Sequence, residues 1–154
     1  MKFLFTSFVF CFLVISCKQN TTKQGAVSSL PGNASPFHPS DIDQLSNTAD
    51  YVDMLFYNLP VSVSQNDRPS IIQTSKFLTT EGIPNTWNVP SIGRLSFSAN
   101  GKIIKELDIH WKDEAKYLTL VENKTPKGSC KISKEGIYFL NQLFTANMTV
   151  KKNQ

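Results

Sequence analysis

Residues 92–111, IGRLSFSANGKIIKELDIHW, carry the clearest structural signal in the chain. Hydrophobic side chains recur at every second position on both sides of a central Asn-Gly pair, with Leu95 and Phe97 before it and Leu107 and Ile109 after it. Alternation with a period of two is typical of strands that bury one face, and Asn-Gly is a preferred hairpin turn. The stretch therefore predicts two antiparallel strands joined by a tight turn.

Two registers compete for this hairpin. A two-residue turn at Asn100-Gly101 would place Leu95 opposite Glu106 and would mix apolar with charged side chains. A three-residue loop over residues 99–101, with the glycine in the left-handed conformation, keeps the strong hydrophobes together. We therefore predict the three-residue loop. Its cross-strand pairs are Phe97–Ile103, Leu95–Lys105 and Arg94–Glu106.

The other elements are predicted from hydrophobic spacing, capping residues and turn residues. We expect helices that begin near residues 40, 68 and 133, strands over residues 117–121 and 129–132, and loops over residues 82–91 and 123–128. Residues 51–57, YVDMLFY, are rich in aromatic and β-branched side chains, which favours a strand. The alternative for residues 51–59 is a continuation of the first helix.

This order of elements predicts a single α+β domain over residues 40–148. Its sheet is expected to have four to five mainly antiparallel strands, with a meander at the C-terminal end and the helices packed on one face. Residues 149–154 are expected to form a polar tail.

The first 17 residues, MKFLFTSFVFCFLVISC, form a different kind of segment. A lysine precedes an apolar run of about 13 residues, which suits a secretory signal and is shorter than the roughly 20 residues that a membrane-spanning helix needs. The run ends in Val14, Ile15, Ser16 and Cys17, which resembles the lipobox of bacterial lipoproteins. The alternative is an ordinary secreted protein that is cleaved near Ser16.

The resemblance implies that the signal peptidase recognises Val14, Ile15 and Ser16, removes residues 1–16, and leaves Cys17 with diacylglyceryl and acyl groups that anchor it in a membrane. Residues 17–39 then form a lipidated cysteine and a polar, flexible tether. The residue after Cys17 is not aspartate. By resemblance to the enterobacterial sorting rule, this favours the outer membrane, with the domain facing the periplasm or the cell surface.

Composition and motifs exclude several classes of function. The chain has 16 Lys+Arg and 12 Asp+Glu, and only Lys2 lies in the predicted signal, so the mature form carries 15 against 12, a net charge too small to indicate nucleic-acid binding. Removal of the signal and lipidation of Cys17 leave Cys130 as the only free cysteine, which is expected to be buried. No phosphate-binding glycine loop, nucleophile elbow or zinc motif occurs. We therefore expect no cofactor and no enzymatic activity.

Two candidate sites remain. Glu106, Asp108 and His110 alternate along one face of the second hairpin strand, where we expect an ordinary solvated face or a polar ligand-binding face. Asp108 and His110 alone are too few ligands for a zinc site, so no metal is expected. Trp87 lies in the loop sequence IPNTWNVP, where it either contacts a partner or folds back over the core.

The sequence thus predicts a lipid-anchored protein of the bacterial envelope whose small domain binds another envelope protein or a ligand. A toxin-neutralising immunity lipoprotein is the first alternative, and a structural envelope component or an enzyme are weaker ones.

Overall fold

The computed structural model describes residues 34–152 of the chain. The predicted lipidation and signal-peptidase residues, Cys17, Val14, Ile15 and Ser16, lie outside the described residues. In chain order, the elements are α1 (Pro39–Thr48), β1 (Tyr51–Phe56), β2 (Ser62–Gln65), α2 (Arg68–Ser75), β3 (Leu78–Gly82), β4 (Ser91–Ala99), β5 (Lys102–Lys112), β6 (Ala115–Glu122), β7 (Thr125–Ile132) and α3 (Lys134–Lys152).

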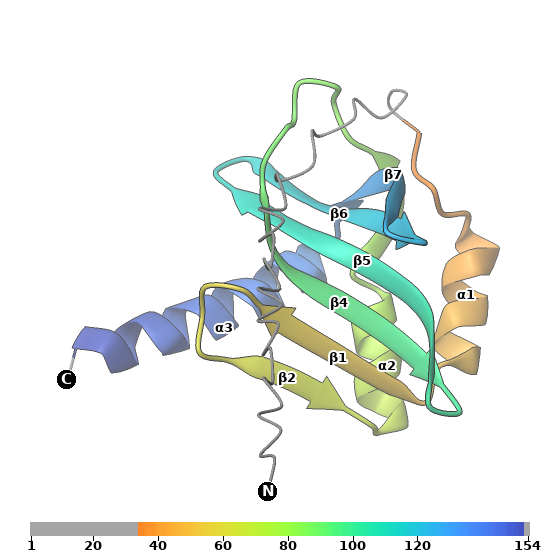
Figure 1. The fold of residues 1–154 in the computed structure, drawn as a ribbon, viewed down its shortest axis with the longest axis horizontal. Helices are drawn as coiled ribbons and strands as arrows, with labels where there is room; N and C mark the ends of the chain where they lie inside the picture. The colour runs from red at the N-terminus through yellow and green to blue at the C-terminus, as the bar shows by residue number, and fades with distance from the viewer. Residues whose placement is uncertain (1–33, 153–154) are drawn as a thin grey trace, which may run out of the picture.

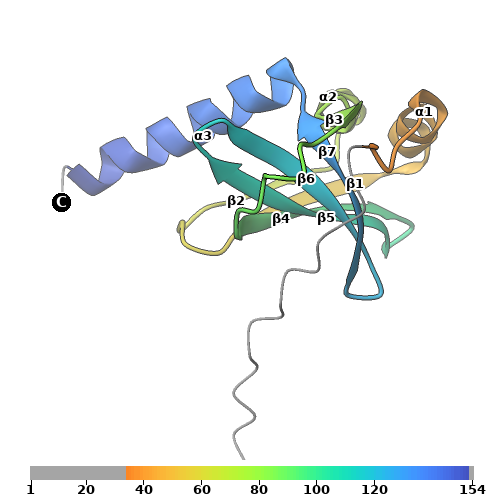
Figure 2. The ribbon, with the colours of Figure 1, turned by 90° about the horizontal axis from the view of Figure 1, so that it is seen from above.

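The seven strands form one sheet in the order β2-β1-β4-β5-β6-β7-β3, and every neighbouring pair is antiparallel. The three helices lie together on one side of this sheet (Figure 1, Figure 2). The predicted α+β class is confirmed, whereas the predicted count of four to five strands is too low. The additional strands are β2 and β3, which occupy the two edges of the sheet.

Both missed strands have weak local signals. β2 is the four-residue stretch SVSQ, and β3 is LTTEG, with a single large hydrophobic side chain. Each of them hydrogen-bonds to only one neighbour, β2 to β1 and β3 to β7. These two edge strands are therefore stabilised by pairing with their neighbours β1 and β7 and not by a local sequence preference.

The turn between β4 and β5 has two residues, so the predicted three-residue loop over residues 99–101 is wrong. Asn100 and Gly101 have φ angles of 51° and 72°, and Ala99 pairs with Lys102 directly outside them. Positive φ at both central residues is the requirement of a type I′ turn, whose twist matches that of the flanking strands.

A β-bulge at Ile104 reconciles this turn with the hydrophobic pattern. Ile104 has no cross-strand partner, and the register shifts there, so Leu95 lies opposite Leu107 and not opposite Glu106. A bulge inserts one residue and thereby reverses which later residues face the core. Without the bulge, the two-residue turn would carry Glu106 to the core face.

The core lies between the sheet and the helices. The central strands contribute Val52, Met54, Leu95, Phe97, Leu107, Ile109 and Leu118, all almost fully buried. The helices contribute Leu45, Ile71, Leu140 and Phe144. Trp111 is partly buried and packs edge-on against Phe144, with ring centroids 5.2 Å apart.

Residues 34–38 belong to the folded part of the chain, although the tether was predicted to reach residue 39. Phe37 is 4% exposed and is part of the core, and Ala34 pairs with Glu81 in an isolated bridge at the β3 edge. α1 begins at Pro39, one residue before the predicted start. Burial of Phe37 therefore fixes residues 34–38 against the domain, although their composition is typical of a linker.

Local turn chemistry also corrects the predicted loop over residues 123–128. Asn123 and Lys124, with φ angles of 51° and 62°, form a tight turn, and β7 begins directly after them.

At residues 51–57 the strand interpretation is confirmed by β1.

The last helix begins where its cap was predicted. The Ser133 hydroxyl oxygen accepts a hydrogen bond from the backbone N–H of Gly136 at 3.1 Å. Such a bond satisfies one of the free N–H groups of the first helical turn. α3 continues to Lys152, so it includes residues 149–152 of the predicted tail.

Candidate functional site on the open face of the sheet

The sheet has one face that none of the helices within residues 34–152 covers (Figure 2). Because side chains alternate along each strand, the residues of this open face follow from the register. One cross-strand row on it contains Leu55, Arg94, Asp108, Thr119 and Ser129, of which the last two are buried. The candidate site residues Glu106, Asp108 and His110 lie on this face, as the alternation predicts.

A network of ion pairs occupies the centre of the open face. Arg94 donates through Nε and Nη2 to Asp108 Oδ1 at 2.9 and 2.8 Å, and its Nη1 lies 3.5 Å from Glu106 Oε1. Burial works against the charge of Arg94, but the hydrogen bond and attraction of Asp108 outweigh it and raise the pKa of the guanidinium. Both carboxylates therefore contact the same arginine, Arg94, which leaves them poor candidates for a metal or a catalytic role.

A stack of three aromatic rings lies at one end of the same face. The ring of His110 lies 4.2 Å from that of Tyr117 at an interplanar angle of 6°, and the ring of Trp87 lies 6.0 Å from Tyr117 at 29°. Trp87 comes from the long loop over residues 83–90 and is partly buried. The structure thus places Trp87 against Tyr117 on the open face of the sheet, and not over the core as one of the two sequence interpretations expected.

Backbone hydrogen bonds fasten that loop to the stack. The N–H of Val89 donates to the Tyr117 hydroxyl at 3.1 Å, and the Val89 carbonyl oxygen lies 2.6 Å from His110 Nδ1. A carbonyl oxygen can only accept, so Nδ1 carries the hydrogen and Nε2 of the neutral ring carries none. Nε2 is buried without a hydrogen-bond partner among the described residues. Burial lowers the pKa of His110, although the bond to Val89 opposes this shift.

Large apolar side chains are exposed around these polar groups. Tyr51 is 39% exposed, Leu55 52% and Ile103 59%, and all three belong to the open face by register. Tyr57 continues the alternation of β1 and is 50% exposed. Its phenol lies close enough to Arg94 to contribute to the raised pKa of the guanidinium. The open face therefore combines a neutralised ionic centre with an apolar surround.

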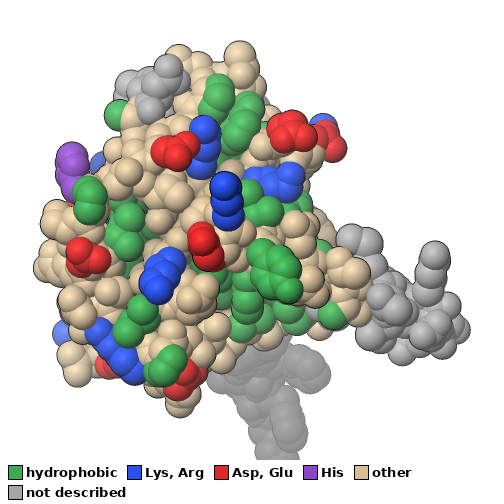
Figure 3. Space-filling view, turned by 180° about the vertical axis from the view of Figure 1, so that it is seen from behind, with side chains coloured by type: hydrophobic (Ala, Val, Ile, Leu, Met, Phe, Trp, Pro, Cys, Tyr) green, Lys and Arg blue, Asp and Glu red, His purple; other side chains and the backbone are tan. Residues whose placement is uncertain are grey.

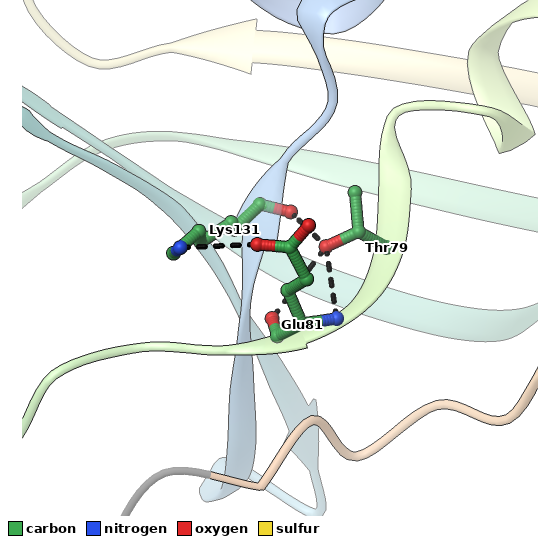
Figure 4. A network of polar contacts seen from close by, with 3 residues as sticks. All are labelled: Thr79, Glu81 and Lys131. Atoms are coloured by element: carbon green, nitrogen blue, oxygen red, sulfur yellow. Dashed lines mark hydrogen bonds and ion pairs between the residues drawn. The ribbon is translucent and has the colours of Figure 1, made fainter.

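The β3 edge of the sheet is closed by its own side chains (Figure 4). The Thr79 hydroxyl donates to the Lys131 carbonyl oxygen at 2.8 Å and accepts from the N–H of Glu81 at 3.3 Å, while Lys131 Nζ lies 3.0 Å from Glu81 Oε2. These contacts bridge an irregularity between β3 and β7, and an irregular, charged edge resists pairing with another chain. The β3 edge is therefore a poor docking strand.

Sequence reasoning missed two residues of the site. Arg94 was expected opposite Glu106, but its principal partner is Asp108, because the bulge shifts the register. Tyr117 carried no functional signal, since its role depends on the loop that reaches it from residues 83–90. Among the described residues, no group of three or more His, Cys, Asp or Glu is placed to hold a metal ion.

Cys130 is fully buried, and burial raises the pKa of its thiol to about 11. It is therefore in the unreactive thiol form at neutral pH. Within residues 34–152, no helix has the length and apolar character required to cross a membrane. No protein-family model matches the chain, and no curated protein or solved structure matches it.

Proposed function

We propose that this protein is a bacterial envelope lipoprotein, anchored through lipid on Cys17, whose domain binds another envelope protein through the open face of its sheet. The observation that supports the binding surface most directly is the set of exposed apolar side chains around the Arg94 ion pairs. On the helix side, by contrast, charged side chains of both signs are scattered among apolar ones (Figure 3). The domain has a non-catalytic role in this proposal.

The composition of the open face suits protein recognition. Exposed tyrosines provide large contact area at a small cost in side-chain entropy, and Leu55 provides an aliphatic contact beside them. Arg94 lies in the same row as Leu55, held in place by two hydrogen bonds to Asp108. A preorganised arginine among aromatic side chains is the usual composition of an interface hot spot.

The lipid anchor is tested by mass. The intact mass of protein extracted by detergent from native membranes should show loss of residues 1–16 and a lipid increment on the Cys17 peptide. A Cys17→Ala variant should show neither. A soluble, unlipidated wild-type protein cleaved near Ser16 would refute the anchor.

The binding face is tested by site-specific photocrosslinking in the native host. A photoreactive side chain at Leu55 on the open face is compared with one at Tyr138 on α3, because both positions are well exposed, at 52% and 68%. We expect a discrete crosslinked protein from position 55 and none of that mass from position 138. Arg94→Glu should abolish the adduct because it reverses the charge at the centre of the face. Equal crosslinking from both positions would contradict the proposal.

A further inference from the structure

The tip of the β4–β5 hairpin exposes two consecutive isoleucines. In a regular strand, neighbouring side chains point to opposite faces, so one of the two would face the core. The bulge at Ile104 instead leaves Ile103 59% and Ile104 36% exposed. Tyr51 lies in the same cross-strand row as Ile103, through Ser98, and is 39% exposed. Ile103 and Tyr51 belong to the open face, whereas Ile104 lines a groove beside Leu45 of α1. Large apolar side chains are therefore exposed on both faces of the sheet at the β4–β5 turn, whose backbone is visible in Figure 1.

Basic side chains lie at this end of the sheet. Lys102 and Lys105 are on β5 at the tip, and Lys124 and Lys127 are on the neighbouring β6–β7 hairpin. Two carboxylates lie among them: Glu122 is 3.5 Å from Lys105 Nζ, and Asp50 accepts a hydrogen bond from the backbone N–H of Asn100 at 2.7 Å. A third carboxylate, Asp41 of α1, lines the same groove as Ile104 and Lys105 and accepts a hydrogen bond from the His38 N–H. Four lysines against these three engaged carboxylates leave this end of the sheet with a small net positive charge.

We propose that this hairpin tip lies against the anionic phospholipid headgroups of the membrane, with Ile103 and Ile104 at the boundary between headgroups and acyl chains. The proposal rests on the lipid anchor at Cys17. Aliphatic side chains at that depth, a tyrosine at headgroup level and lysines that reach the phosphates are the side chains that interfacial contact requires. The charge of this end of the sheet is complementary to an anionic leaflet.

Because the protein is already anchored by lipid, a weak contact between the hairpin tip and the membrane is enough to orient the domain. Two isoleucines and a few lysines would hold a free domain on a membrane only transiently. Lipid on Cys17, however, keeps Ala34 within about 60 Å of the surface, because 17 residue steps of fully extended chain reach no further. Tip contact is then an intramolecular step with a high effective concentration.

Contact through the tip also orients the binding face. The strands run away from the tip, and Asp108, which lies in the row of Leu55 and Arg94, is about 17 Å further along β5 than Ile103, from five steps of strand. The row that contains Leu55 and Arg94 therefore stands clear of the membrane. Protein recognition through that row and lipid contact through the tip use different parts of the sheet.

The test measures depth in the membrane with a fluorescent label on an introduced cysteine. Lipidated full-length Ile103→Cys protein is labelled, reconstituted into phosphatidylglycerol-containing liposomes and quenched with bromine-substituted lipids. Lipidated Tyr138→Cys is the matched control, since Tyr138 is at least as exposed as Ile103 but lies on α3. Cys130 does not interfere because it is buried. We expect quenching at position 103 to be about threefold that at position 138 or more.

Charge and lipid controls complete the experiment. Lys102→Glu with Lys127→Glu, or vesicles of phosphatidylcholine alone, should reduce quenching at position 103 to the level of position 138. Quenching that is equal at both positions refutes tip contact, and quenching that is unchanged by charge reversal refutes the anionic surface. A photoreactive group at position 103 that crosslinks a protein and no lipid in the native envelope also overturns the proposal.

Only protein whose mass shows lipid on Cys17 enters these liposomes. A negative quenching result therefore refutes the tip contact and leaves the anchor standing, whereas the absence of lipid refutes the anchor itself.

Discussion

Acidification should loosen the loop over residues 83–90 through His110. The neutral ring donates Nδ1–H to Val89, and its Nε2 is buried without a partner in the part of the chain that the structure describes. Protonation would add a charge and a second N–H donor where no acceptor lies, which is why burial lowers the pKa of His110. A histidine whose pKa is lowered by folding stabilises the protein fully above its unfolded pKa, and this stabilisation is lost as the pH falls below it.

The size of the effect follows from the unfolded pKa of about 6.5. A single proton contributes at most about 1.4 kcal/mol per pH unit, and the unfolded histidine is only partly protonated around its pKa. Between pH 7 and pH 5.5, the loss in free energy of unfolding therefore cannot exceed about 1.3 kcal/mol. The carboxylates of Asp67 and Glu135, whose pKa values are lowered by hydrogen bonds at helix starts, lose their contribution at lower pH. The window from pH 7 to pH 5.5 therefore isolates the histidines.

Urea unfolding at pH 7.0, 6.5, 6.0 and 5.5 measures this loss, with hydrogen exchange of the Val89 amide as a local probe. His110→Phe keeps a ring against Tyr117 but cannot titrate, so its free energy of unfolding should be constant in this window. His38→Asn controls for the second histidine and should behave as wild type. A wild-type protein whose stability is flat over the window, or a His110→Phe variant that declines equally, would refute the reasoning.

Further predictions concern the core, a close backbone approach and the buried thiol. Leu107→Ala should lower the free energy of unfolding by about 2–5 kcal/mol, whereas Ile103→Ala on the surface should change it by less than about 0.5 kcal/mol; urea unfolding compares them. Gly93→Ala should cost about 3 kcal/mol, because its Cβ would lie 2.4 Å from the backbone oxygen of Leu55, and a melting temperature equal to wild type would contradict this. Cys130 should react with a thiol reagent only at the rate of unfolding, and rapid labelling in the native state would show that it is accessible.

Local signals predicted the elements that are formed by neighbours in sequence. Alternating hydrophobes predicted β4, β5 and β6, a serine cap predicted the start of α3, and a proline in the first turn predicted α2. These signals are reliable because the interactions behind them, turn conformation, capping and a one-sided apolar face, span only a few residues.

The bulge marks the limit of such rules. The Asn-Gly pair indicates a two-residue turn, and the alternation indicates that Leu95 and Leu107 share a face, but a regular hairpin cannot satisfy both. The structure satisfies both by leaving Ile104 unpaired, since the gain from burying Leu95 against Leu107 exceeds the loss of one ladder pairing. Only the packed core selects that solution.

The candidate site divides in the same way. The sequence by itself determined that Glu106, Asp108 and His110 share a face, because the period of a strand is two, and it alone carries the lipobox signal that ends at Cys17. Tertiary structure decided that Arg94 binds Asp108 and that Trp87, Tyr117 and His110 stack. Those contacts join residues 7 to 30 positions apart in the chain, and their energy is available only after the sheet has brought the strands together.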